Sequence, residues 1–241
     1  MSDATDTRPE TLVDAPVGTP ILSARTVTRT FGATQALRGA DVDVRAGEVL
    51  AVMGPSGSGK STLLHCLAGI LKPDDGEVWF DGMRVDTLSE TARTELRRRR
   101  FGFVFQFGQL VPELSALENV ALPLLLGGTS RVRALATADG WFERLRLDGL
   151  QRRQPGELSG GEAQRVALAR SMVASPDVVF ADEPTGSLDS LAGELVMDLL
   201  VDSARGEGTT VVLVTHEPRV AAYADREVVV RDGRVATLVP L

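Results

Sequence analysis

The sequence of 241 residues predicts an α/β fold with three parts: a core on a mostly parallel sheet, an antiparallel β subdomain and a helical subdomain. Apolar strands alternate with helical segments through most of the chain, which is typical of a parallel sheet with both faces covered. The turn sequences Pro73–Gly76 and Asp81-Gly82 flank a short strand, which indicates antiparallel pairing. Residues 90–157 are mostly helical and separate two parts of the α/β pattern, so we expect them to form the helical subdomain.

The antiparallel subdomain begins close to the N-terminus. Residues 1–20 carry acids, threonines and prolines and predict a disordered tail, so the folded domain is expected over 21–241. Residues 21–31 alternate loosely between apolar and polar and predict a strand. A turn is expected at Gly39, and a second, antiparallel strand is expected around Val42 and Val44.

A glycine-rich loop follows the apolar strand 48–53 and precedes a helical segment, 62–69. Strand, loop and helix are the context that a phosphate-binding loop requires. Small residues let backbone N–H groups converge on a polyphosphate, and the helix N-terminus adds unpaired donors. We therefore expect a P-loop NTPase core, with Lys60 at the β- and γ-phosphates and the Ser61 hydroxyl on Mg²⁺. The nucleotide-binding candidates of this loop are Gly54, Pro55, Ser56, Gly57, Ser58, Gly59, Lys60, Ser61 and Thr62.

The middle of the chain predicts a helix over 87–100, a strand over 101–105 and a helix pair over 131–150. The first helix ends in Arg97–Arg100. A solvated helix end that complements the dipole is the favoured interpretation of this run, and contact with a partner or with lipid headgroups is the alternative. The apolar, proline-broken stretch 107–128 suggests a docking surface, which we expect to be lined or bordered by Leu110, Leu114 and Leu117.

Two later strands end in residues that suit nucleotide hydrolysis. The strand 177–181 leads to Asp182-Glu183, and the strand 209–214 leads to Thr215-His216, before a closing hairpin over 227–238. Asp182 would anchor Mg²⁺ beside Ser61. Glu183 would orient and deprotonate the attacking water. An exposed acidic strand end would be the simpler interpretation if the phosphate loop were absent.

A second potential anion site begins at Ser159-Gly160-Gly161-Glu162. As a physical pattern it is an N-cap as readily as a ligand site. Together with the other motifs, however, the chain from residue 21 to 241 resembles the nucleotide-binding subunit of ATP-binding-cassette (ABC) transporters. The resemblance implies an ATPase that uses ATP and Mg²⁺, that dimerises with a second copy of itself, and that drives a separate integral membrane permease.

The resemblance also implies roles for single residues. Phe31 stacks on adenine; Gln106 senses Mg²⁺ and the γ-phosphate; Asp182 binds the metal; Glu183 is the catalytic base; His216 contacts the γ-phosphate. Residues Leu158–Gln164 match the signature that caps the γ-phosphate of the opposite subunit, and Ser187-Leu188-Asp189 match a loop that crosses the dimer interface. Because every motif is intact, a homodimer with two competent sites is favoured.

The subgroup is indicated by 102–106, 110–124 and 182–189, which look like the exporter branch for lipoproteins, macrolides and antimicrobial peptides. The stretch 127–153 matches that branch weakly and leaves the substrate open. One alternative is a soluble cassette acting on ribosomes or DNA, but the chain has one cassette and lacks a long coiled coil. Another alternative is an ABC ATPase that regulates a permease-like membrane protein in cell-envelope signalling or division without transport.

Composition bounds these hypotheses. The net charge of −7 argues against nucleic acid as a partner. One cysteine, Cys66, excludes an intramolecular disulfide, and no export signal is visible. We therefore expect a cytoplasmic protein, and the resemblance implies that it lies peripherally on the inner face of the cell membrane.

Overall fold

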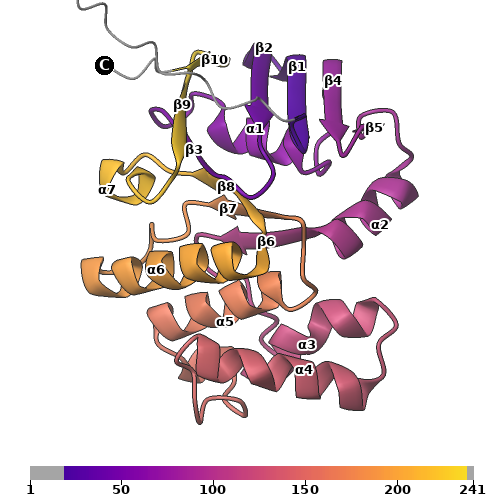
Figure 1. Cartoon of the computed structure of the whole chain (residues 1–241). Helices are drawn as coiled ribbons and strands as arrows, with labels where there is room; N and C mark the ends of the chain where they lie inside the picture. Colours follow the sequence, from indigo (N-terminus) through magenta and orange to yellow (C-terminus); the bar gives the residue numbers. More distant parts are fainter. Residues whose placement is uncertain (1–18, 238–241) are drawn as a thin grey trace, which may run out of the picture.

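The computed structural model describes residues 19–237, so nearly all of the predicted tail lies outside the described residues. The smaller of two sheets is antiparallel, with the order β2-β1-β4-β5 (Figure 1). Its strands are β1 (Leu22–Phe31), β2 (Thr34–Val44), β4 (Asp75–Phe80) and β5 (Met83–Arg84). The antiparallel β subdomain is therefore present as predicted.

The larger sheet has the order β10-β9-β3-β8-β7-β6. Strand β3 pairs in parallel with β8 and β9, β7 pairs in parallel with β6 and β8, and only β10 runs antiparallel to its neighbour. The strands are β3 (Val49–Met53), β6 (Phe101–Phe105), β7 (Val178–Asp182), β8 (Thr210–Val214), β9 (Arg226–Arg231) and β10 (Arg234–Thr237). This is the mostly parallel sheet that the alternating pattern predicts.

The buried side chains form two cores, one on each face of the larger sheet. Val178 and Phe180 of β7 lie in the core that also holds the antiparallel sheet, whereas Val179 and Ala181 lie in the core on the other face. This alternation follows from the two-residue period of a strand that is covered on both sides. Helix α1 (Lys60–Leu67) packs in the first core and contacts strands of both sheets.

Helices cover the second face (Figure 1). Helix α5 packs on β6, α3, α4 and α6, so it joins the helical region to the sheet. The helices are α2 (Glu90–Arg100), α3 (Ala116–Leu126), α4 (Arg131–Arg144), α5 (Gly160–Met172), α6 (Ser190–Glu207) and α7 (Pro218–Ala221), with a 3₁₀ turn at Pro155–Glu157. No helix within residues 19–237 is both long and apolar enough to cross a bilayer.

Two local expectations are wrong. The chain does not turn at Gly39, because β2 continues through this residue. The pairing register with β1 shifts there: Ala40 pairs with Val27, and Arg38 pairs with Thr28. Over 131–150 there is one helix rather than two. Its end is set by Arg146, which has a positive φ of 55°, and by the Leu147 N–H, which donates to the Phe142 carbonyl at 2.7 Å in a Schellman arrangement.

The arginine run at the end of α2 is paired within the chain. Arg97 contacts Glu90, both Arg98 and Arg99 contact Glu95, and Arg100 contacts Asp81 and Asp177. Hydrogen bonds from Arg93 and Arg97 lower the pKa of Glu90 to about 2. These pairs neutralise the run, which favours the solvated helix end over a lipid-binding patch. Strand β6 lies inside the predicted helical subdomain and belongs to the larger sheet; the boundary 90–157 itself stays a prediction.

Candidate functional site

The phosphate loop joins the end of β3 to the start of α1 and is held against two other strands. A Cβ atom at Gly54 would lie 2.2 Å from the Val230 carbonyl oxygen, and one at Gly59 would lie 2.5 Å from the Ala36 carbonyl oxygen. Both glycines also have positive φ angles, 144° and 108°. Only glycine fits both positions, because neighbouring backbone leaves no room for a side chain.

Two polar side chains of the loop are buried and poised for an anion. The Lys60 ammonium donates to the carbonyl oxygens of Gly54 and Pro55, at 2.9 and 3.1 Å, and is 7% exposed. The Ser58 hydroxyl is buried without a hydrogen-bond partner. An unpaired buried hydroxyl costs free energy, and a phosphate oxygen would satisfy it. The loop therefore has the geometry of a polyphosphate cradle.

Ser61 and Asp182 come together from different elements. The Ser61 hydroxyl, on the first turn of α1, donates to Asp182 Oδ1 at 3.1 Å, at the carboxyl end of β7. Burial raises the pKa of Asp182, which the Ser61 hydrogen bond and the nearby His65 partly offset. A hydroxyl and a carboxylate beside a phosphate cradle are the hard oxygen ligands that Mg²⁺ takes, so the residues present fit this ion.

Glu183 and His216 form a second pair beside the first. Nδ1 of His216 lies 2.8 and 2.9 Å from the two carboxylate oxygens of Glu183. Glu183 follows β7 with a positive φ of 49°, and its N–H donates to the Val214 carbonyl at the end of β8. Such a backbone conformation is strained for a residue with a side chain and is often found at functional sites. Two parallel strands thus bring the predicted base and histidine together.

Gln106 lies in the same open cleft of about 340 Å³, together with Ser61, Asp182 and Glu183. The backbone around Gln106 accepts hydrogen bonds from two side chains whose role the sequence did not indicate. The Gln164 amide donates to the Phe105 carbonyl at 2.8 Å, and the Arg170 guanidinium donates to the carbonyls of Gly108 and Gln109, at 2.6 and 2.8 Å. Both come from α5, and only the three-dimensional packing of α5 on β6 reveals these contacts.

His65 is also missed by the sequence analysis, although it lines this cleft. It follows Ser61 by four residues on α1, and this spacing places both side chains on one helix face. The spacing was therefore a usable signal.

Phe31 lies at the end of β1, where it is 45% exposed. Residue Ala36, a short way along the β1–β2 hairpin, lines a pocket of about 150 Å³ with Gly57, Gly59, Lys60 and others of the phosphate loop, including Thr62. The hairpin thus borders the cradle through Ala36, and the same hairpin carries the exposed ring of Phe31.

The start of α5 is arranged differently. Ser159 caps the helix in a capping box: its hydroxyl accepts the Glu162 N–H at 3.3 Å, and the Glu162 carboxylate accepts the Ser159 N–H at 2.7 Å. Within the described residues, neither pocket that borders the phosphate loop is lined by residues 159–162. Figure 1 shows α5 below the larger sheet and α1 above it. The structure therefore does not bring the second anion site to the first within one chain.

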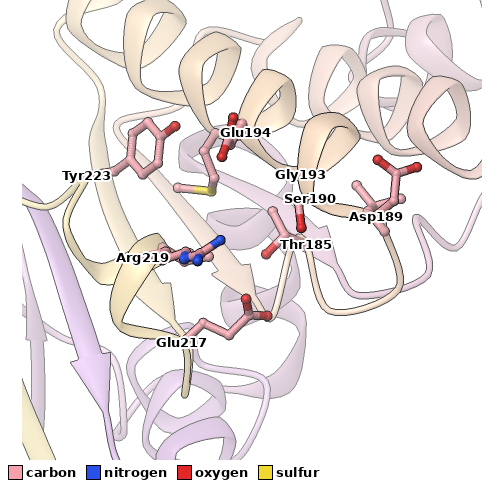
Figure 2. A pocket seen from close by; sticks show the side chains of 11 residues that line it. Thr185, Asp189, Ser190, Gly193, Glu194, Glu217, Arg219 and Tyr223 are labelled. Carbon is pink, nitrogen blue, oxygen red and sulfur yellow. The ribbon is translucent and has the colours of Figure 1, made fainter.

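A separate pocket of about 100 Å³ lies between α6 and α7 (Figure 2). Asp189 borders it, but the Asp189 carboxylate accepts the Ala192 N–H at 2.9 Å and so caps α6. The other lining residues include Thr185, Glu194, Glu217 and Tyr223 and no member of the phosphate loop. This pocket is therefore distinct from the nucleotide cleft.

A phosphate loop, a buried strand that ends in two carboxylates and a histidine from the next strand define a nucleotide-hydrolysing P-loop protein. Comparison narrows the class. A family model described as "ABC transporter" matches residues 37–186. The chain belongs to this family, and it is an ATP-binding, ATP-hydrolysing cassette of it.

Similar proteins and solved structures support this family assignment. The chain is 41% identical to the lipoprotein-releasing system ATP-binding protein LolD of Hyphomonas neptunium, over 90% of this chain and 96% of the relative. It is 44% identical to LolD 2 of Caulobacter vibrioides over the same shares. Among solved structures, the dimeric ATP-binding cassette MJ0796 bound to ADP and Pi is 37% identical, with a TM-score of 0.82, over 91% of this chain and 100% of that one.

Proposed function

We propose that the chain works as one of two identical subunits that close around two ATP molecules and open after hydrolysis. The observation that carries the proposal is the meeting of Ser61 with Asp182, next to the Glu183–His216 pair, at the carboxyl ends of β7 and β8. Ligands of open α/β sheets bind at this edge. The dimeric cassette of similar fold with bound ADP and Pi supports a two-subunit arrangement.

The residues divide the work of phosphoryl transfer. Lys60 and the loop N–H groups hold the β- and γ-phosphates, and Ser61, Asp182 and Gln106 would hold Mg²⁺, which neutralises charge on those phosphates. Glu183 orients the attacking water and accepts its proton. His216, held by Glu183, contacts the γ-phosphate. The loop donors act mainly by electrostatic stabilisation of charge in the transition state.

The second half of each site comes from the other subunit. The N-terminus of α5, with Ser159, Gly160, Gly161 and Glu162, lines neither pocket at its own phosphate loop. The first N–H groups of a helix lack intrahelical acceptors and can bind an anion. Placed against the partner's γ-phosphate, these groups complete the donor shell. Asp189 belongs to the neighbouring loop and serves the same interface.

The permease would dock in an apolar groove on the other side of the Gln106 segment. The groove measures about 440 Å³ and lies between α2, β6, α3 and α5; its lining includes Ile70, Phe103, Phe105, Leu122 and Leu126. Leu110, Leu114 and Leu117 do not line it, and Leu110 and Leu117 pack against the second core instead. The place of those leucines at a permease surface stays a prediction, as does that of the segment as a whole.

The groove connects docking to catalysis through one strand. Phe105 lines both the groove and the catalytic cleft, and the next residue, Gln106, lies in the cleft. Movement of an inserted permease helix would thus reach Gln106 over one peptide unit. A subunit that docks in this way lies peripherally on the inner face of the membrane.

The cargo we propose is lipoprotein-like. The relatives named lipoprotein-releasing system ATP-binding proteins match 90% of this chain at 41% and 44% identity, which supports this proposal. The role would be to supply ATP-driven motion to a permease that carries the substrate-binding surface.

The decisive experiment uses Glu183→Gln. The amide keeps the shape of the side chain and loses the base, so the variant should bind Mg-ATP, hydrolyse it very slowly and accumulate as a dimer in size-exclusion chromatography with light scattering. Glu217→Gln changes a carboxylate that follows His216 in the sequence but lines the separate pocket of Figure 2; it is the control and should behave as wild type. A Glu183→Gln variant that binds ATP and stays monomeric at high concentration would contradict the proposal.

A further inference from the structure

Arg29 and Phe31 lie two residues apart on β1, so their side chains emerge on the same face of the strand. The guanidinium carbon of Arg29 lies over the Phe31 ring, 5.0 Å from the ring centroid. This distance falls within the range of a cation–π interaction. One face of the exposed ring is thus covered by a cation.

Arg29 is fixed in this position by the turn that precedes β4. Its guanidinium donates to Asp74 Oδ1 at 2.5 Å and to the Lys72 carbonyl at 3.2 Å. Asp74 in turn accepts the Thr30 N–H at 2.7 Å, and its own N–H donates to the Thr28 carbonyl. The arginine is therefore held by two residues of the same turn, and these contacts fix its guanidinium over the Phe31 ring.

The pair lies on the same β-hairpin as Ala36, which borders the phosphate-loop pocket. The β1–β2 hairpin that carries Phe31 continues to Ala36, which borders the pocket of Gly57, Gly59 and Lys60. Phe31 keeps 45% of its surface exposed although Arg29 covers one face. The uncovered surface is free for a flat ligand group whose phosphates sit in the loop.

We propose that Arg29 is a positioning residue for the nucleotide base and that it forms, with Phe31 and a bound purine, a three-layer stack of guanidinium, phenyl ring and base. The inference rests on the proposed function, in which Phe31 stacks on adenine. Arg29 holds the ring at one orientation, which reduces the ordering cost of base binding. It also withdraws electron density from the ring, which makes the opposite face a better partner for an electron-rich purine.

The test measures affinity for two ligands by calorimetry: Mg-ATP, which has a base, and inorganic tripolyphosphate, which uses the loop alone. Arg29→Gln should weaken Mg-ATP binding about two- to five-fold and leave tripolyphosphate binding unchanged, which is the range of an exposed cation–π contact. Arg29→Lys, which keeps the charge, should recover part of the loss. Thermal unfolding of each variant checks that the fold is intact.

Arg25→Gln is the matched control. Arg25 lies on the same strand and pairs with Asp43 at 2.6 Å, so its loss removes the same charge and a similar ion pair without touching an aromatic ring. We expect it to leave both affinities unchanged. An equal loss of ATP and tripolyphosphate affinity in Arg29→Gln would overturn the inference, because it would show a general charge or folding effect.

Phe31→Ala distinguishes the role of Arg29 from the adenine stacking on Phe31 that the proposed function includes. If Phe31→Ala weakens ATP relative to tripolyphosphate and Arg29→Gln does not, the base platform stands and the role of Arg29 is refuted. If Phe31→Ala leaves the ratio of the two affinities unchanged, adenine stacking itself is refuted and the inference falls with it. In the double variant, Arg29→Gln should add nothing to Phe31→Ala, because the ring through which it acts is gone.

Discussion

The two candidate anion sites of this chain, the phosphate loop and the start of α5, both contain glycine and serine but differ in how their side chains are paired. At the phosphate loop, side chains from other elements converge: Asp182 meets Ser61, and the Ser58 hydroxyl is left unpaired. At the start of α5, the hydroxyl of Ser159 is satisfied by its own helix through Glu162. The phosphate loop thus brings together side chains that can hold a ligand, whereas the start of α5 is a helix cap whose side chains are paired with each other.

This difference indicates which of the two sites would need a second subunit to supply its ligand. A helix N-terminus keeps N–H groups without intrahelical acceptors, and the capping box satisfies only part of them. A polyphosphate held by another subunit can accept the rest. In the proposed dimer, the phosphate loop would bind the nucleotide of its own chain, whereas the α5 end would act on the nucleotide of its partner.

The largest effect should come from Lys60→Ala. The ammonium is buried against the loop carbonyls and is the point charge nearest the expected β- and γ-phosphates. Its loss should lower ATP turnover by about 10²- to 10³-fold or more, as for other transition-state donors. Steady-state phosphate release measures this, and Lys72→Ala, which changes the only other lysine, is the control and should be near wild type. Wild-type turnover in Lys60→Ala would break the assignment of the loop.

The next effect separates the two ends directly. Gly160→Asp places a side chain and a negative charge at the α5 end, where a Cβ meets only Leu188 at 3.4 Å, so the fold should tolerate it. The homodimer should lose nearly all ATPase activity, because a carboxylate repels the γ-phosphate. Mixing it with Lys60→Ala should restore part of the activity, since the heterodimer contains one intact pair of phosphate loop and α5 end.

If both sites of a dimer must work together, the mixture will stay inactive, and a second measurement decides. Cysteines introduced at Ser58 and Ser159 should form a disulfide between chains when Mg-ATP is present. Cross-linking within one chain, or none with ATP bound, would contradict shared sites. The native Cys66 should not interfere, because burial raises the pKa of its thiol to about 12 and keeps it protonated.

Much of the fold and of the nucleotide site could be predicted from the sequence. The apolar strands before Asp182 and His216 and the glycine pattern before Lys60 are local signals, and parallel strands necessarily bring their carboxyl ends to one edge. The contacts of Gln164 and Arg170 with the Gln106 segment could not be predicted, because they depend on how α5 packs on β6. The end of α4 was missed because a non-glycine residue, Arg146, takes the left-handed conformation that usually signals glycine.

A smaller and more specific effect is expected at the groove. Leu126→Glu places a charge on a side chain that is 61% exposed and lines the groove, so the fold and the basal ATPase activity should be kept within about two-fold. Transport by the complex reconstituted with its permease should fall strongly, because a buried unpaired charge opposes docking. Val132→Glu, on α4 and 81% exposed outside the groove, is the matched control and should leave transport unchanged. An equal loss of basal activity in both variants would mean that the surface supports the fold rather than a partner.

The smallest expected effect concerns the helix cap at Ser159. Within the described residues, α3 has a nearly identical capping box that serves as a control. Ser115 caps α3 with Glu118 as Ser159 caps α5 with Glu162, and in both boxes the hydroxyl accepts the N–H of the glutamate at 3.3 Å. Ser115→Ala and Ser159→Ala should each lower the free energy of unfolding by about 0.5–2 kcal/mol, the usual cost of losing an N-cap. If Ser159 is only a cap, the two variants should have the same ATPase activity once both are fully folded at low temperature. If Ser159 also donates to the partner's γ-phosphate, Ser159→Ala should lose about ten-fold or more in turnover while Ser115→Ala keeps it, since a donor to a developing charge is worth more than a cap. Denaturant unfolding and phosphate release, measured on the same preparations, separate the two roles of this one hydroxyl.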